Sequence, residues 1–194
     1  MRRVEDRDAK QAVAAASSHR FHGTVWRVHW KDVAPTDWRL SLRTTGRYHR
    51  GLDLFPADQA FLALYTSLAP EIAIWEMVRQ STARNLAYLQ NNVLTELEVS
   101  LERMLDLSHP AAIGLADSDL IGDDLQLCEK LAAVARDRGH EGLPVPSAAL
   151  PGLNLVFMPR DHTADVQFRV VRSRDLPLDT ITREHPDDAR RQDR

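Results

Sequence analysis

The order of strand-like and helix-like segments constrains the fold of this chain more than any other feature of its sequence. Apolar and polar residues alternate in residues 21–30 and again from residue 93 onward, as in strands with one solvated face. Helical spacing instead marks residues 70–86 and 123–138. Because the two kinds of segment do not alternate regularly, we expect a compact α+β domain with a mainly antiparallel sheet and flanking helices, not a doubly wound sheet.

The same patterns divide the chain into a single domain and two short ends. Residues 1–20 are expected to form a helix or leader, residues 21–181 the domain, and residues 182–194 a flexible charged tail with too few apolar side chains to fold alone. Shorter extended segments are predicted within the domain at residues 60–65, 143–147, 154–158 and 166–171. The alternating carboxylates that follow residue 93 are expected to be solvated.

Charge and composition exclude several classes of protein. The chain has 25 Lys and Arg residues against 28 Asp and Glu residues, which leaves no basic surplus for binding a nucleic-acid backbone. No apolar run approaches the roughly 20 residues of a membrane span, and the first residues lack a signal peptide's apolar stretch. Cys128 is the single cysteine of the chain, which fits a reducing compartment. We therefore expect a cytoplasmic protein that binds neither nucleic acid nor membranes.

The motifs of many cofactor and metal sites are missing from the sequence. The eight glycines form neither a G-x-G turn nor a phosphate-binding P-loop. Residues 117–122 begin like a calcium loop, but Ile121 and Cys128 occupy two of the positions that need oxygen ligands. His19 and His22 have a spacing that can bring two imidazoles together, yet no third ligand follows nearby. We therefore predict no metal site and no true cofactor.

Glu76 is the most informative single residue of the sequence. It interrupts the apolar block that residues 72–78 form within a predicted helix. A carboxylate in such a block must be paired, protonated or used in chemistry, because an unpaired buried charge costs several kcal/mol. A structural ion pair with Arg79 or with a loop arginine is the simpler alternative.

Five further side chains are candidates for a site, and each also has an ordinary structural explanation. Arg27 lies in a predicted strand, where most arginines are edge charges. Arg47 lies in a turn-rich loop, where a guanidinium can bind a phosphate or carboxylate or simply be solvated. Tyr48 and Tyr65 can pack or stack, and Ser147 can satisfy a turn. These residue types alone leave both explanations open.

Five short motifs, in this order, resemble the RES domain family, which is named for its Arg, Glu and Ser. They are W-R-V at 26–28, G-R-Y-H-R-G at 46–51, L-Y-T at 64–66, I-W-E at 74–76 and V-P-S-A at 145–148. The similarity continues through residues 94–99 and 154–157 and spans about residues 21–178. The chain departs from the family at Tyr48 and His49, where Trp-Asn is common.

The resemblance implies a role for each candidate. Glu76 would stabilise the positive charge that develops on a ribose when its bond to nicotinamide breaks, or orient the nucleophile. Arg27 and Arg47 would hold the phosphates of NAD. Tyr48 or Tyr65 would stack on the nicotinamide ring, and Ser147 would bond to the ribose or the carboxamide. Glu76, Arg27 and Ser147 are thus the expected catalytic residues.

The resemblance also implies a biological function. It indicates the toxin of a bacterial type II toxin–antitoxin pair, with a fold similar to that of ADP-ribosyltransferases and an activity that consumes NAD as substrate, with water or inorganic phosphate as co-substrate. Its partner would be an Xre-type antitoxin, and the complex can contain more than one copy of the chain. Two alternatives stay open. One is an ADP-ribosyltransferase that modifies a protein from the same site, and the other is a catalytically silent binding module.

Overall fold

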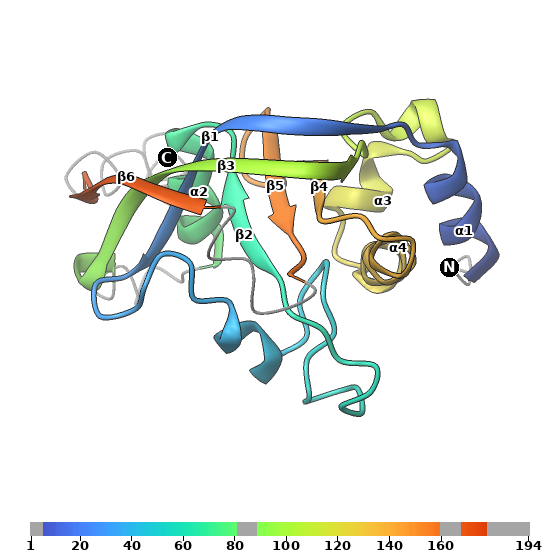
Figure 1. The fold of residues 1–194 in the computed structure, drawn as a ribbon, viewed down its shortest axis with the longest axis horizontal. Coiled ribbons are helices and arrows are strands. Elements are labelled where there is room, and N and C mark those ends of the chain that lie inside the picture. The colour runs from blue at the N-terminus through green and yellow to red at the C-terminus, as the bar shows by residue number, and fades with distance from the viewer. Residues whose placement is uncertain (1–5, 81–88, 160–167, 178–194) are drawn as a thin grey trace, which may run out of the picture.

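The computed structural model describes residues 6–80, 89–159 and 168–177 and has the predicted α+β class (Figure 1). Its elements are, in chain order, α1 (Asp6–Ala15), β1 (Ser18–Trp30), the 3-10 helix η1 (Arg39–Arg43), β2 (Leu64–Ser67), α2 (Pro70–Gln80), β3 (Asn92–Leu105), the 3-10 helix η3 (Pro110–Ile113), α3 (Asp117–Ile121), α4 (Gln126–Asp137), β4 (Gly142–Pro146), β5 (Leu153–Phe157) and β6 (Phe168–Asp175). Within the described ranges, no helix is long and apolar enough to cross a membrane.

The six strands form one sheet that closes on itself. The strand order is β1-β2-β5-β4-β3-β6, and β1 also pairs with β3. β1 and β3 are antiparallel from the pair Ser18–Leu105 to the pair Trp30–Asn92, whereas β3 and β4 meet in parallel at Met104–Gly142. The long strands β1, β3 and β6 lie together and cross β2, β5 and β4 (Figure 1). The sheet is therefore mainly antiparallel, as predicted.

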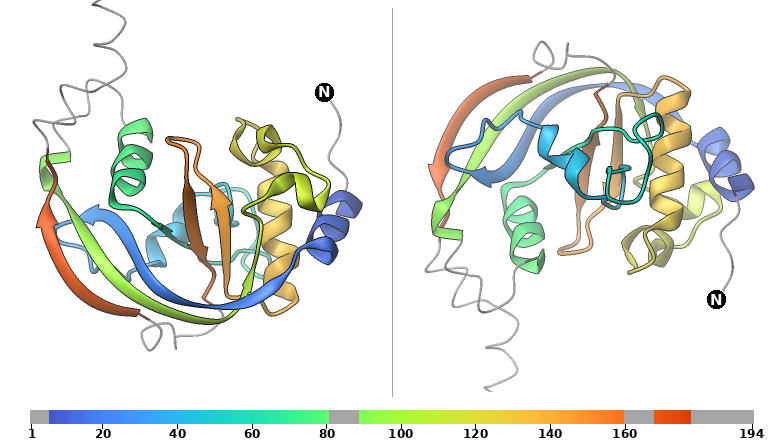
Figure 2. Two further views of the ribbon diagram at one scale, coloured as in Figure 1. Left: turned by 90° about the horizontal axis from the view of Figure 1, so that it is seen from above. Right: turned by 90° about the horizontal axis from the view of Figure 1, so that it is seen from below.

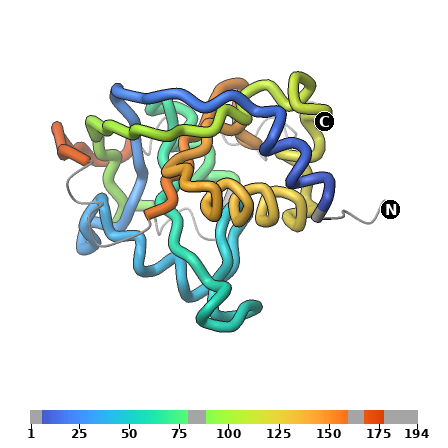
Figure 3. The backbone as a smooth tube through the Cα atoms, turned by 45° about the vertical axis from the view of Figure 1, so that its right-hand side comes forward, coloured from blue at the N-terminus to red at the C-terminus, as the bar shows by residue number. Residues whose placement is uncertain are grey.

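Helices flank the group of strands formed by β2, β5 and β4 on two sides. α2 lies on one side of this group, and α4 and α1 lie on the other (Figure 2). α1 packs along α4, although most of the chain separates them in sequence (Figure 3). Ala9, Ala12 and Val13 of α1 are buried in the same apolar cluster as Leu131 of α4 and Val156 of β5. The N-terminal segment is thus a packed helix rather than a loose leader.

One prediction about an individual strand was wrong, and one was incomplete. The predicted strand at residues 60–65 instead begins at Leu64, because Phe61 forms only an isolated bridge with Arg50 of the preceding loop. The carboxylates of β3 were expected to be solvated, but Glu96 and Glu98 lie opposite arginines of β6. They form ion pairs with Arg172 and Arg169.

The remaining predicted elements agree with the structure where it describes them. The helix predicted from residue 70 is α2, and its predicted final turns lie outside the described residues. The helix predicted to stop at Gly139 is α4, and Gly139 has the left-handed φ of 89° that favours glycine after a helix. The predicted charged tail at residues 182–194 also lies outside the described residues.

Candidate active site

A cavity of about 700 Å³ lies beside α2, where β1 and β2 diverge. Among the described residues, β1 and β2 pair only at Trp26 and Ser67. The register of the sheet continues this row through Asn154 of β5 to Val145 of β4, and all four of these side chains line the cavity. The loop between η1 and β2 lines the cavity as well. The cavity is therefore built on strands whose relative positions the sheet fixes.

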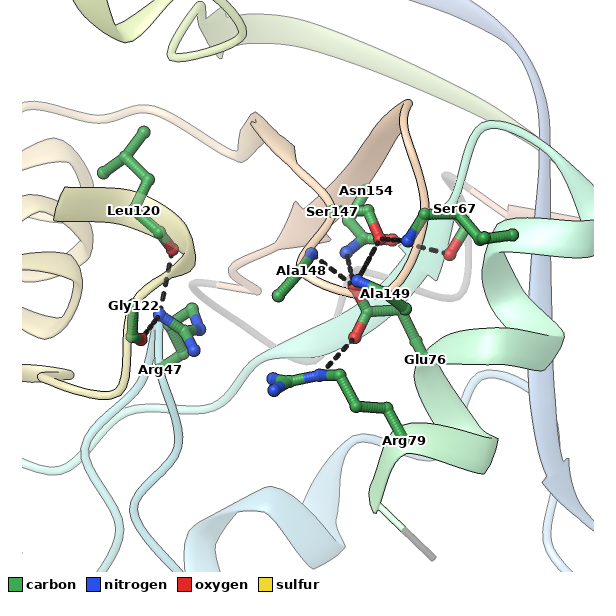
Figure 4. Close-up of polar contacts among 11 residues, drawn as sticks. Arg47, Ser67, Glu76, Arg79, Leu120, Gly122, Ser147, Ala148, Ala149 and Asn154 are labelled. Atoms are coloured by element: carbon green, nitrogen blue, oxygen red, sulfur yellow. Dashed lines mark hydrogen bonds and ion pairs between the residues drawn. The ribbon is translucent and has the colours of Figure 1, made fainter. Parts of the chain in front are cut away.

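Glu76 projects from α2 to the cavity wall, and the structure shows what pairs with its charge. The Oε1 atom accepts hydrogen bonds from Ser147 Oγ at 2.6 Å, from Asn154 Nδ2 at 2.7 Å and from the N–H of Ala148 at 3.1 Å (Figure 4). The Oε2 atom lies 3.9 Å from Arg79 Nε. The side chain is 19% exposed. Among the residues that the structure describes, one oxygen is therefore held by three donors, and the other has a loose ion pair with Arg79.

The local sequence explains how α2 presents this carboxylate. Pro70 and Glu71 suit the first turn of a helix, where no N–H partner is needed and negative charge is favourable. Ile74 and Val78 lie on the helix face roughly opposite Glu76 and are buried in one apolar cluster with Leu94 of β3. Glu76 is thereby left on the face that borders the cavity.

Ser147 is buried and contacts the Glu76 carboxylate, whereas its neighbours Pro146 and Ala148 line the cavity. Its hydroxyl donates to Glu76 and accepts the N–H groups of Ala149 and Leu150 at 3.1 and 3.4 Å. Ser147 thus ties the β4–β5 turn to α2. This placement favours a positioning role for Ser147 over a direct bond to the ribose.

Arg27 lines the cavity and is held by main-chain carbonyls. Its Nη1 donates to Pro35 O at 2.5 Å, and its Nη1 and Nη2 donate to Asp37 O at 3.3 and 3.2 Å. Burial lowers the pKa of Arg27 to about 10, an effect that the nearby charge of Asp37 partly offsets. The guanidinium is therefore still protonated at neutral pH, and its orientation is fixed.

Arg47 also lines the cavity but lies apart from Glu76, next to α3 (Figure 4). Its Nη1 donates to Leu120 O at 2.9 Å and to Gly122 O at 2.7 Å. A guanidinium has five N–H groups, so these two bonds still leave donors on Nε and Nη2. The structure therefore brings Arg27, Arg47 and Glu76 to one cavity, with the Arg47 guanidinium at a distance from the carboxylate.

The two tyrosines differ in how far they face the cavity. Tyr48 is 2% exposed, and burial raises the pKa of its hydroxyl well above the usual value. Tyr65 is 37% exposed. Its hydroxyl accepts the Tyr48 N–H at 2.9 Å, and burial of this end of the side chain raises its pKa as well. The exposed ring of Tyr65 is thus better placed than Tyr48 to stack on a ligand.

His49 anchors the Tyr65 hydroxyl. Its Nε2 lies 2.7 Å from Thr44 O, and a carbonyl only accepts hydrogen bonds, so Nε2 must hold the proton. The Nδ1 atom then accepts from the Tyr65 hydroxyl at 2.9 Å. Burial lowers the pKa of His49, which favours this neutral form.

Sequence reasoning missed some of the polar residues of the site. Asn154 was considered only as part of a motif, although a polar residue within the apolar run 153–157 is a signal that its side chain has a partner. His49 was noted only as a departure from the family. The carbonyls that hold Arg27 and Arg47 leave no trace in residue type, because every residue has one.

The site has the groups for binding and cleaving a charged ligand. Arg27, Arg47 and Arg79 supply positive charge, and Glu76, Asp37 and Asp123 supply negative charge around the same cavity. Within the described ranges, no group of three or more His, Cys, Asp or Glu residues is arranged to hold a metal ion. A pinned carboxylate between arginines can stabilise a cationic centre in a ligand whose anionic groups the arginines bind.

Comparison with known proteins identifies the family. Residues 24–179 match the RES domain, and the chain belongs to the RES domain family. A chain in the crystal structure of the M. tuberculosis MbcT–MbcA toxin–antitoxin complex has a similar fold, with a TM-score of 0.73 and 22% sequence identity. The similarity covers 90% of this chain and 95% of that chain. A search of the curated proteins found no match.

Proposed function

We propose that this protein is the toxin of a toxin–antitoxin pair and that it cleaves the bond between nicotinamide and ribose in NAD. One observation supports this most directly. Three donors occupy Oε1 of Glu76, and the Glu76 side chain borders a cavity that is also lined by Arg27 and Arg47. Membership of the RES family and a fold shared with a chain of a toxin–antitoxin complex support the biological role.

The proposed reaction uses the geometry of the cavity as follows. The bond from ribose C1′ to the nicotinamide nitrogen breaks, and its electron pair leaves with nicotinamide. The ribose becomes cationic in the transition state, and Oε2 of Glu76 stabilises that charge. Water, which loses a proton to the solvent, or inorganic phosphate then adds to C1′. Arg27 and Arg47 bind the pyrophosphate oxygens, and the Tyr65 ring stacks on the cationic nicotinamide.

Nicotinamide release by the purified protein tests the chemistry. We expect release from NAD by the wild type and a loss of roughly 10³-fold or more in kcat/KM for Glu76→Gln, which keeps the shape but removes the charge. Glu71→Gln is the matched control, because Glu71 is an exposed glutamate of the same helix. An active, folded Glu76→Gln protein contradicts the role of Glu76.

Running the assay with and without inorganic phosphate separates the possible acceptors. Release that requires phosphate indicates phosphorolysis, and release without phosphate indicates hydrolysis. If the wild type releases no nicotinamide under either condition, the alternatives are transfer of ADP-ribose to a protein, which labelled NAD detects, or a silent binding module.

Growth of cells that express the chain tests the toxin role. We expect the wild type to arrest growth and lower cellular NAD, and we expect Glu76→Gln to do neither. We also expect an Xre-type antitoxin to restore growth by covering the cavity near Arg27 and Arg47. If cells grow normally while they express the active wild type, the toxin role is rejected. If the wild type saturated with antitoxin still cleaves NAD at the full rate, the antitoxin does not cover the cavity.

A further inference from the structure

Asn154 makes the same contact as Ser147 with the Glu76 carboxylate, from a different element. Its Nδ2 lies 2.7 Å from Glu76 Oε1, and its Oδ1 lies 2.7 Å from Ser67 Oγ (Figure 4). We propose that Asn154, anchored by Ser67, is a positioning residue that fixes Glu76 for NAD cleavage. This inference rests on the proposed function and adds two residues to its machinery.

The chemistry of the three groups determines the direction of both hydrogen bonds. An ionised carboxylate only accepts, so the amide nitrogen of Asn154 must face Glu76. The amide oxygen then faces Ser67, whose hydroxyl must donate. If the amide turned over, its oxygen would oppose the carboxylate oxygen of Glu76. The Glu76 carboxylate therefore selects this orientation of the amide, and the bond from the Ser67 hydroxyl to Oδ1 holds the other end of the Asn154 side chain in place.

The sheet holds this pair in place. Ser67 of β2 and Asn154 of β5 are directly opposite partners in the antiparallel register. Side chains at opposed positions project from the same face of a sheet, about 5 Å apart at Cβ. Asn154 is also paired with Val145 of β4, so a strand lies on each side of it. Asn154 is thus a rigid point from which to hold a side chain on α2.

The Glu76 carboxylate depends on contacts from other elements, because the torsions of its own side chain do not fix its orientation. The terminal torsion of a glutamate is broad, so the two oxygens can exchange places unless external contacts distinguish them. Ser147 and the Ala148 N–H approach Oε1 from the β4–β5 turn, and Asn154 approaches it from β5. Together these donors fix which oxygen borders the substrate.

The substitution Asn154→Asp tests the proposal, because it keeps the shape and replaces a donor with an acceptor. We expect kcat for nicotinamide release to fall by roughly 10- to 100-fold while KM changes less than about 3-fold. The acidic limb of the pH–rate profile should move to higher pH, because two adjacent carboxylates share a proton. Ser67→Ala should lower kcat in the same way but less. The control is Asn91→Asp, an exposed residue with the same change of charge.

Two kinetic results overturn the proposal. One is an unchanged kcat and pH profile in Asn154→Asp. The other is a raised KM at constant kcat, since this indicates that Asn154 contacts the substrate and does not act through Glu76. A purely structural role would lower the melting temperature and leave the pH profile of the folded enzyme unmoved.

Thermal unfolding separates failure of this inference from failure of the proposed function. Asn154→Asp should lower Tm by roughly 3 to 8 °C through repulsion from Glu76. The double variant Glu76→Gln/Asn154→Asp should recover part of that loss, because it removes the charge on α2 that repels the new carboxylate on β5. A wild type without nicotinamide release rejects the proposed function. Loss of Tm without recovery in the double variant rejects the inference, whatever the activity.

Discussion

At the scale of single residues, Ser147 links the stability of the fold to catalysis. Ser147→Ala removes the 2.6 Å bond to Glu76 and the acceptor for two N–H groups of the turn. We expect the free energy of unfolding to fall by about 1 to 2 kcal/mol, as measured by urea denaturation, and kcat to fall as well. Ser118→Ala, at an exposed serine of α3, is the control and should change neither. Full activity in Ser147→Ala would contradict a positioning role.

His49 makes stability depend on pH near neutrality. Burial lowers its folded-state pKa below the unfolded value of about 6.5, so the unfolded chain binds more protons in this range. Stability should therefore fall as pH drops from 7.5 to 5, by at most about 1.4 kcal/mol per pH unit for one group. His29, whose pKa is also lowered by burial, contributes in the same direction.

His49→Asn isolates the part of this dependence that belongs to His49. Asn does not titrate and is the residue common in the family at this position, so the variant should fold. We expect a flatter dependence of the unfolding free energy on pH between 7.5 and 5 than in the wild type, measured in urea. The control His19→Asn changes an exposed histidine and should keep the wild-type slope. An equal slope in His49→Asn would show that His49 titrates normally.

At the scale of elements, the β4–β5 turn sets the position of α2. Gly152 in this turn has a φ of 143°, and a Cβ atom there would lie 2.3 Å from Ile72 Cδ1 on α2. Gly152→Ala should therefore cost about 1 to 3 kcal/mol of stability and lower kcat, because it pushes on the helix that holds Glu76. Urea denaturation and nicotinamide release measure the two effects.

Gly114 offers a matched control for the strain in that variant. Its φ is 78°, so alanine is strained there too, but a Cβ atom would meet nothing within 4 Å. Gly114→Ala should thus lose stability through the backbone alone and keep the kcat of the wild type. Equal kcat losses in the two variants would show that the contact with Ile72 is not what positions α2.

At the scale of the whole molecule, α1 belongs to the folded unit although it precedes the residues that match the RES domain. Ala12 is 2% exposed, in the core cluster that α1 shares with α4, whereas Ala14 of the same helix is exposed. We expect Ala12→Asp to lower the unfolding free energy by about 2 to 4 kcal/mol and Ala14→Asp by less than about 0.5 kcal/mol, measured in urea. Similar losses in both would contradict the packing of α1.

Much of the secondary structure followed from the sequence because local periodicity reports burial. β3 alternates in period two from Leu97 to Glu102, and α4 shows helical spacing up to Gly139. The start of β2 was predicted wrongly because local periodicity reports burial and does not report strand pairing. Phe61 is apolar because it packs in the core, but strand pairing depends on a neighbour that local pattern does not reveal.

The sequence by itself determined the α+β class and singled out Glu76, because a carboxylate in an apolar helix must have a partner. Only the tertiary structure decided which partners it has. Ser147 and Asn154 lie 71 and 78 positions away along the chain, and they meet Glu76 because strand register and helix docking bring them together. Such contacts depend on the packing of distant elements, which no local pattern encodes.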